Sequence, residues 1–168
     1  MTTPTVLTVC LGNICRSPTA EAAIREAADE AGLELTVRSA GTGGWHVGEP
    51  PDARMRRAAA QVGLELDGAA ERVDAEMLRG ADLILAMDHS NLRDLERLAD
   101  RAGVDTPIHL FREFDPDPGN GEVPDPYYGG ADGFVEVVGI VRRTARELVR
   151  RIAAGELDLG GADGEGAA

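Results

Sequence analysis

The chain has 168 residues, a length typical of one domain, and 43% of them are hydrophobic, which is enough to form a real core. It carries 17 basic residues, all of them Arg, against 30 acidic ones, giving a net charge of −13. This balance, without a block of clustered cations, excludes nucleic acid as an expected partner because binding to a phosphate backbone needs such clusters.

The two cysteines, Cys10 and Cys15, are too few for a disulfide framework. The histidines do not stand at metal-ligand spacing from one another, so we expect no metal and no other cofactor. No apolar run reaches membrane-spanning length and no signal-peptide pattern appears, so we expect a cytoplasmic protein with no membrane partner. Export without a signal peptide would leave no mark in the sequence, and a monomer is our working expectation.

The first forty residues predict a strand, a tight loop, a helix and a second strand. Val6–Val9 is a short apolar, β-branched run that ends at Cys10, as expected of a buried strand. A Ser-Pro pair suits the start of a helix, with Ser17 as its cap and Pro18 at its first position. Gly32 is a typical residue to end that helix, and residues 35–39 indicate the second strand.

The rest of the chain continues this alternation. We predict helices over 53–62, 90–102 and 131–154, strands over 82–87 and 107–111, and a loop rich in Asp, Pro and Gly over 115–130. The class is therefore α/β: a single domain over 1–155 with a four-stranded parallel, Rossmann-like sheet and helices on both faces. Residues 156–168, rich in Gly, Ala and acidic residues, would form a disordered acidic tail.

The segment between the first strand and the first helix has the composition of a phosphate-binding loop, placed where ligands bind in such folds. Gly12 and Asn13 tolerate left-handed backbone conformations, which let successive N–H groups converge on an anion. The helix N-terminus and the Arg16 guanidinium would add positive charge. The predicted phosphate-binding residues are Leu11, Gly12, Asn13, Ile14, Cys15 and Arg16.

Cys10 lies at the mouth of this loop, where the positive field should favour its thiolate form. Ser17 is close enough in sequence to donate a hydrogen bond to the sulfur. A thiolate facing a bound phosphate is a nucleophile facing phosphorus, so the pattern indicates a cysteine-dependent phosphatase. The alternative is an ordinary buried cysteine at a strand end, which would leave unexplained Gly12, Asn13, Arg16, Ser17 and Pro18.

Residues 9–18, VCLGNICRSP, resemble the signature of the low-molecular-weight protein tyrosine phosphatases. The likeness covers roughly residues 5 to 152, in the family's order. Its further segments are SAGT at 39–42, Trp45, PDAR at 51–54, AMDHSNL at 86–92, DPYYGG at 125–130, and Phe134.

This resemblance implies hydrolysis of protein phosphotyrosine, and of small aryl phosphates, through a phosphocysteine intermediate. Cys10 would be the nucleophile, while Arg16 and the loop amides would bind the equatorial oxygens. Asp125 would protonate the leaving phenolate and then act as a base on water. Asn13 would hold the strained loop, with Ser39 as a supporting neighbour.

Three Asp-Pro pairs lie in the predicted 115–130 loop, and only the family's DPYY pattern selects Asp125. For Asp115 and Asp117 we predict turn chemistry. The resemblance also implies walls for the phenyl ring, and it suggests the two tyrosines among them as phosphorylation targets. These wall residues are Leu11, Trp45, Tyr127 and Tyr128.

The sequence leaves two features undecided. The family pairs residues at the places of Cys10 and Cys15 in a reversible disulfide that guards against irreversible oxidation, whereas Cys15 could also be a small buried support for the loop. Many members carry a His and an Arg where this chain has Gly68 and Glu71. That His often braces the loop Asn, so its absence leaves the support of Asn13 undecided.

Three alternatives compete with the tyrosine phosphatase. An arsenate reductase of the same fold needs further cysteines, which this chain lacks beyond Cys15. A protein-arginine phosphatase resembles this loop but carries Thr in place of Ile14, whose larger side chain should crowd a guanidinium. A non-catalytic phosphate-binding regulatory module would not need Cys10, Arg16 and Asp125 together. The sequence does not specify the physiological substrate.

Overall fold

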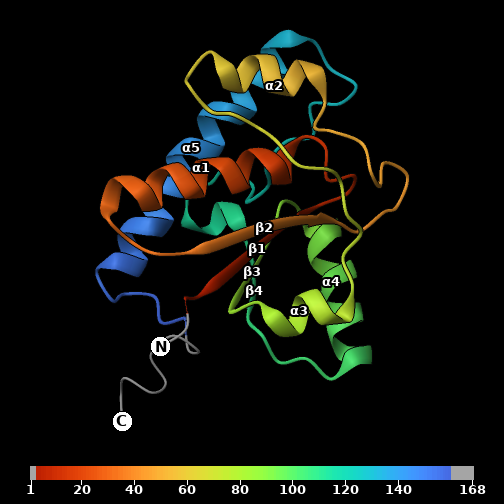
Figure 1. The fold of residues 1–168 in the computed structure, drawn as a ribbon, viewed down its shortest axis with the longest axis vertical. Helices are drawn as coiled ribbons and strands as arrows, with labels where there is room; N and C mark the ends of the chain where they lie inside the picture. Colours follow the sequence, from red (N-terminus) through yellow and green to blue (C-terminus); the bar gives the residue numbers. More distant parts are fainter. Residues whose placement is uncertain (1–2, 160–168) are drawn as a thin grey trace.

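A computed structural model describes residues 3–159, which form a sheet of four parallel strands between two layers of helices (Figure 1). The strand order is β2-β1-β3-β4, so the chain crosses over between neighbours that are not consecutive. This arrangement confirms the predicted α/β class and the predicted parallel sheet. The strands are β1 (Thr5–Cys10), β2 (Thr36–Gly41), β3 (Leu83–Ala86) and β4 (Ile108–Leu110).

The predicted helices all form, and one short helix appears that the sequence did not predict. The predicted cap of the first helix is wrong, because that helix already begins at Arg16 and Cys15, not Ser17, is at its cap position. α3 has six residues and buries only Leu78, too little for a helical period to show in the sequence. Its start is set by Asp74, whose side chain accepts a hydrogen bond from Met77 N at 2.8 Å. The helices are α1 (Arg16–Ala31), α2 (Ala53–Ala60), α3 (Ala75–Gly80), α4 (His89–Ala102) and α5 (Ala131–Ala153), with a 3-10 turn, η1 (Phe111–Phe114).

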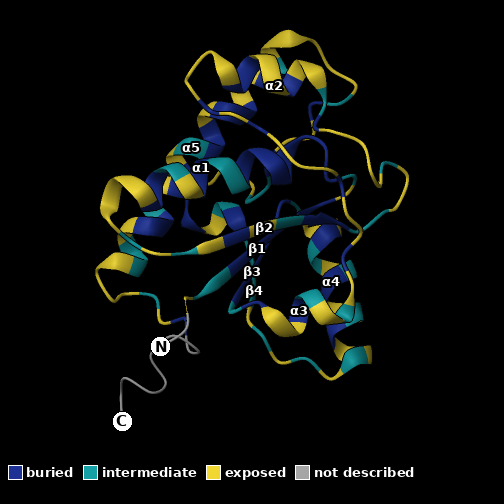
Figure 2. Cartoon of the chain, viewed as in Figure 1, coloured by how far each residue is buried: buried dark blue, intermediate teal, exposed yellow. Residues whose placement is uncertain are grey.

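The sheet separates two buried clusters (Figure 2). Val6 and Cys10 of β1 face the larger cluster, which includes the apolar sides of α1 and α5. Leu7 and Val9 face the smaller one, under α3 and α4. Because alternate residues of one strand point to opposite faces, β1 is apolar on both sides, as a central parallel strand requires.

Two glycines end helices, and for Gly32 this confirms the prediction from the sequence. Gly32 and Gly103 have φ angles of 68° and 67°, and their N–H groups bond back to the last turns of α1 and α4. After these ends the chain returns to start β2 and β4, each parallel to the strand before its helix. Because all four strands are parallel, their carboxyl ends lie at one edge of the sheet.

The packing continues past α5. Leu157 packs against the larger cluster and Leu159 is only 6% exposed within it. The remainder of the predicted tail, 160–168, lies outside the described residues, so the tail stays a prediction. Within residues 3–159, no helix is both long enough and apolar enough to cross a bilayer.

Candidate active site

The phosphate loop (residues 10–17) leaves the carboxyl end of β1, a central strand, and enters α1. Its sharpest turn is at Asn13, whose φ of 58° makes it the one non-glycine residue with a positive φ among those the structure describes. This turn aims the Asn13 N–H back at Cys10 Sγ, 3.2 Å away. The predicted left-handed kink is confirmed at Asn13.

Asn13 is fixed by three side-chain hydrogen bonds behind the loop. Its Nδ2 donates to Ser17 Oγ at 2.8 Å and to Ser39 Oγ at 3.0 Å, while its Oδ1 accepts from Glu71 N at 2.8 Å. Ser39 Oγ in turn donates to Glu21 Oε1 at 2.7 Å, and burial raises the pKa of Glu21. Both predicted supports, Ser17 and Ser39, therefore contact the residue that holds the turn.

These contacts also show what supports Asn13 in this chain, which has Gly68 where many family members carry a His. Gly68 has a φ of 83°, and no atom lies within 4 Å of the place where its Cβ would be. It borders a cavity of about 300 Å³ behind the loop. The brace on the Asn13 carbonyl oxygen is a main-chain N–H, that of Glu71, which no side-chain pattern in the sequence could reveal.

Cys10 is 2% exposed, and its Sγ lies 3.0 Å from Ser17 Oγ. Ser17 Oγ already accepts the Asn13 amide, so its own proton is free for the sulfur or for Ala40 O at 3.3 Å. The shorter contact is the one to sulfur. Two donors, the Asn13 N–H and the Ser17 hydroxyl, can thus stabilise a thiolate at Cys10.

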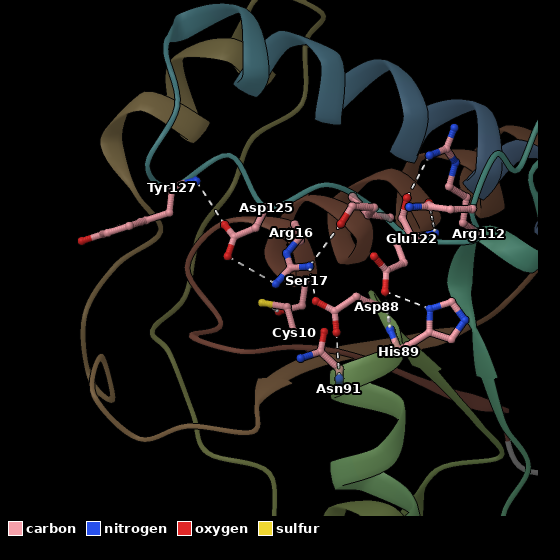
Figure 3. Close-up of polar contacts among 12 residues, drawn as sticks. Cys10, Arg16, Ser17, Asp88, His89, Asn91, Arg112, Glu122, Asp125 and Tyr127 are labelled. Atoms are coloured by element: carbon pink, nitrogen blue, oxygen red, sulfur yellow. Dashed lines mark hydrogen bonds and ion pairs between the residues drawn. The ribbon is translucent and has the colours of Figure 1, made fainter.

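Arg16 is 3% exposed and is held along one edge of its guanidinium (Figure 3). Nη1 donates to Asp88 Oδ2 at 2.8 Å and to Val123 O at 3.1 Å. Nη2 has only a 3.6 Å contact with Asp125 Oδ2. The Nε–Nη2 edge therefore remains available for a two-pronged hydrogen bond to phosphate.

Asp88 is a site residue that sequence reasoning did not select. It follows β3 by two residues and caps α4, accepting from Asn91 N at 2.7 Å. Burial alone would lower the pKa of Arg16, but Cys10 and the Asp88 carboxylate outweigh it and raise that pKa. An acidic residue just after a central strand was the available signal, because such strand ends share one edge of the sheet.

The acid loop (residues 115–130) contains no helix or strand and carries Asp125 to the same place. The Asp125 side chain is 46% exposed, and its Oδ1 accepts from Tyr127 N at 3.1 Å. The loop is anchored at its start by Asp115, which binds Arg143 at 2.7 Å and Arg112 at 2.8 Å. Asp115 Oδ1 also accepts from Asp117 N at 2.9 Å, which confirms the predicted turn chemistry for Asp115, while that of Asp117 stays a prediction.

Both loops line one cavity of about 320 Å³. The three predicted catalytic residues and the four predicted wall residues all border it. Asn13, Ser17 and Ser39 do not line it and lie behind the loop instead. The lining residues are Cys10, Leu11, Gly12, Ile14, Cys15, Arg16, Trp45, His46, Asp125, Tyr127 and Tyr128.

The aromatic residues that line the cavity differ in their exposure and in their contacts with other side chains. Trp45 is 72% exposed and Tyr128 is 94% exposed, whereas Tyr127 is half-buried. The guanidinium of Arg54 stacks on the Tyr127 ring, 5.3 Å from its centroid. His46 is a further wall that the sequence did not predict, with its ring 6.1 Å from that of Tyr127.

Gly41, at the end of β2, lies directly against the backbone of the phosphate loop. A Cβ there would lie 2.6 Å from Leu11 O and 3.1 Å from Asn13 N, so the loop backbone occupies the space of a side chain. The SAGT segment therefore needs a glycine for close backbone approach, a role that sequence reasoning missed.

Cys15 borders the cavity as a buried free thiol, as Cys10 does. Burial, followed in importance by the charge of Asp52, raises the pKa of Cys15 to about 12. Cys15 is therefore a neutral thiol at physiological pH, and its reversible disulfide with Cys10 stays a prediction. Among residues 3–159, no three His, Cys, Asp or Glu side chains gather as metal ligands would.

Comparisons with known proteins agree with this geometry. A sequence model of the family described as low molecular weight phosphotyrosine protein phosphatase matches residues 5–157. A low molecular weight protein-tyrosine-phosphatase of Streptomyces coelicolor is 43% identical over 148 residues, covering 86% of this chain and 90% of that protein.

Two solved structures are similar over most of the chain. A protein tyrosine phosphatase from Entamoeba histolytica has a TM-score of 0.85 at 34% identity, with 92% of this chain and all of that chain covered. A Drosophila arginine phosphatase has a TM-score of 0.83 at 30% identity, with 88% and 96% covered. The sequence match and the fold together confirm the predicted resemblance: the chain belongs to the low-molecular-weight phosphotyrosine protein phosphatase family.

Proposed function

We propose that this protein hydrolyses phosphotyrosine in proteins, and small aryl phosphates, with Cys10 as the nucleophile. The observation that carries the proposal is the meeting of Cys10, Arg16 and Asp125 at one cavity of about 320 Å³. In the first step the Cys10 thiolate attacks phosphorus and forms the S–P bond while the P–O bond to the tyrosine breaks. Asp125, entering as the acid, gives its proton to the leaving phenolate oxygen.

In the second step water attacks the phosphorus of phosphocysteine. The Asp125 carboxylate takes a proton from that water, the S–P bond breaks, and Cys10 leaves as a thiolate stabilised by Asn13 N–H and Ser17. Inorganic phosphate is the product, and both side chains return to their starting protonation states. No redox partner and no cofactor enter the balance.

Arg16 and the loop amides would stabilise the charge on the equatorial oxygens in both steps. The Arg16 Nε–Nη2 edge, left open by the contacts of Nη1 with Asp88 and Val123 O, has the geometry for two parallel hydrogen bonds to phosphate. Because this cation is fixed before substrate arrives, little reorganisation is needed when charge develops.

The walls favour a phenyl phosphate. Leu11, Trp45 and Tyr127 provide apolar and aromatic surface at the mouth of the cavity, which suits the ring of a tyrosine. Phosphoarginine is the second candidate substrate, because the chain is also similar to a Drosophila arginine phosphatase. Ile14 lines the cavity and is expected to crowd a guanidinium there.

The largest effects we predict are those of the nucleophile and the acid. Cys10→Ser should abolish hydrolysis of an aryl phosphate because a hydroxyl is a far weaker nucleophile at neutral pH. Asp125→Ala should lower kcat by about 100-fold or more, as expected for loss of a general acid. The measurement is steady-state hydrolysis with and without a chelator, which should leave the rate unchanged.

Full activity in Cys10→Ser would refute the mechanism, and so would complete loss of wild-type activity in the chelator. Orthovanadate, an analogue of the pentacoordinate transition state, should inhibit the hydrolysis. Matched phosphotyrosine and phosphoarginine peptides then decide the substrate class, and we expect a higher kcat/KM for phosphotyrosine. A preference for phosphoarginine would assign the protein to the second candidate.

A further inference from the structure

The active-site cavity opens sideways into a groove along α4. Leu11 and Trp45 line both the catalytic cavity and a neighbouring open groove of about 500 Å³. A second section of about 350 Å³ continues this groove to Arg101, near the end of α4. The two sections are continuous because they share Thr42, Arg72 and Asp94.

The groove is cationic although the protein is strongly acidic. Three guanidinium groups line it, those of Arg72, Arg97 and Arg101, against the single carboxylate of Asp94. Arg97 is paired with Asp94 at 3.1 Å. Within the described part of the chain, Arg72 and Arg101 have no carboxylate at ion-pair distance. Two exposed, unpaired cations thus border a groove on a chain whose net charge is −13.

The spacing along α4 suits an extended peptide. Asp94, Arg97, Leu98 and Arg101 share one helical face, since they are three, four and seven residues apart from the first. At 1.5 Å per residue, Asp94 and Arg101 lie about 10 Å apart, which is the length of about three extended residues. Val73, which is buried, and Leu98, which is half-buried, give the groove an apolar floor between its charges.

We propose that this groove binds the residues that flank the phosphotyrosine in protein substrates and that Arg72 and Arg101 select acidic ones. The proposal rests on the proposed function, because the groove begins at the wall of the catalytic cavity. Its occupant is an acidic stretch of the substrate chain, about two to five residues from the phosphotyrosine, extending past Trp45 toward the end of α4.

The test uses phosphotyrosine peptides that differ only in the charge of the flanking residues. One set carries three Glu residues two to five positions before or after the phosphotyrosine, and its matched set carries Gln at the same positions. For the wild type we expect kcat/KM to be about threefold to tenfold higher for the Glu peptide than for its Gln match, either when the Glu residues precede the phosphotyrosine or when they follow it. The effect is modest because each exposed charge pair contributes little binding free energy. The gain should appear in KM rather than in kcat, and it should shrink at high salt.

The double variant Arg72→Gln/Arg101→Gln should bring the Glu-to-Gln ratio of kcat/KM close to one. A small aryl phosphate, too short to reach the groove, reports any damage to the catalytic site and normalises the comparison. The matched control is Arg56→Gln/Arg146→Gln, which removes the same charge from two exposed arginines on α2 and α5 that have no carboxylate at ion-pair distance among residues 3–159. The control should keep the wild-type preference.

Each remaining outcome counts against the proposal. An equal loss of preference in the control would mean that only the overall field attracts acidic peptides. An active wild type without any preference would overturn the groove while leaving the phosphatase intact. A wild type inactive on the aryl phosphate would refute the proposed function, and the groove proposal would fall with it.

Discussion

The phosphate loop and the acid loop meet at one cavity, yet the first is buried and bonded from several sides while the second is exposed at its functional residue. Cys10 and Arg16 are 2% and 3% exposed, and hydrogen bonds hold the sulfur, the turn and the guanidinium. The Asp125 side chain is 46% exposed and accepts one backbone hydrogen bond, from Tyr127. The anion site is therefore fixed before substrate arrives, whereas the position of Asp125 depends on contacts made elsewhere in its loop.

This difference matches the chemistry proposed for each loop. Groups that stabilise the phosphoryl charge work best when they are preorganised and shielded from water. A general acid must instead regain its proton and admit water for the second step, so exposure suits it. Its position then depends on anchors at the start of the loop, chiefly Asp115, and on Glu122, which accepts from His89 N at 3.0 Å and lies 2.8 Å from His89 Nδ1.

Asp115 anchors the acid loop, and a single substitution removes this anchor. Asp115→Asn should lower the free energy of unfolding by about 3 kcal/mol, because it leaves the Arg112 and Arg143 guanidinium groups without their buried carboxylate. Protonation of the leaving group should become slower. Aryl phosphates whose phenol has a high pKa should therefore lose more activity than those whose phenol has a low pKa. Urea unfolding and a series of aryl phosphates measure the two effects. The matched control is Asp117→Asn, which changes an exposed carboxylate in the same loop.

The pH dependence of this anchor has a definite sign. Burial alone would raise the pKa of Asp115, but hydrogen bonds from Arg143, the Asp117 N–H and Arg112 hold the pKa well below its usual range. Its contribution to stability is therefore present above the unfolded pKa, about 3.9, and is lost as the pH falls below that value. Asp115→Asn should flatten this acid limb of the stability curve. An unchanged limb would show that other carboxylates dominate it.

The phosphate loop can be disturbed without changing a catalytic side chain. Gly41→Ala would place a Cβ 2.6 Å from Leu11 O, so the loop backbone must shift. We expect kcat/KM to fall by about 100-fold, the effect of a misplacement of about 1 Å. Binding of orthovanadate should weaken as well, because the same amides hold it.

Gly139→Ala is the control for this change. It lies within α5, and no atom outside its own helix backbone lies within 4 Å of the place where its Cβ would be. It should keep full activity and stabilise the protein by about 0.5 to 1 kcal/mol through helix propensity. If Gly41→Ala were as active as Gly139→Ala, the phosphate loop would be less constrained from below than its contacts imply.

The sequence predicted most of the fold and much of the site, for physical reasons that the two loops illustrate. Val6–Val9 and the Gly-Asn turn act locally, so their strand and loop could be read from residue types alone. Asp125 could not be chosen from composition, because its neighbours Asp115 and Asp117 precede Pro in the same way; only the family resemblance selected it.

What the sequence missed depends on contacts between distant segments. Asp88 is 72 residues from Arg16, and Glu71 N is 58 residues from the Asn13 oxygen that it binds. Gly41 supports the loop through backbone approach, which leaves no pattern in the residues around it. Main-chain contacts of this kind become predictable only when the sheet order is known.

A further prediction concerns Cys15, which shares the cavity with Cys10 but is held as a neutral thiol. Burial, with the charge of Asp52 second, raises its pKa from 9.0 to about 12. The folded protein then keeps a proton that the unfolded chain loses above pH 9, so stability from this group is complete below pH 9 and is lost between about 9 and about 12. At pH 10 the loss should be about 1.4 kcal/mol relative to pH 7.

Cys15→Ala should remove this alkaline loss, apart from any uniform drop in stability caused by the smaller side chain. Urea unfolding at pH 7, 8, 9 and 10 on both proteins separates the two effects, since the drop is constant with pH and the ionisation term is not. An equal decline in both proteins would mean that Cys15 ionises freely in the folded state. Once peroxide had oxidised Cys10 to its sulfenic acid, the Cys15 thiolate would then readily attack that sulfur, forming the S–S bond as hydroxide leaves. A thiol held neutral would close the predicted disulfide slowly.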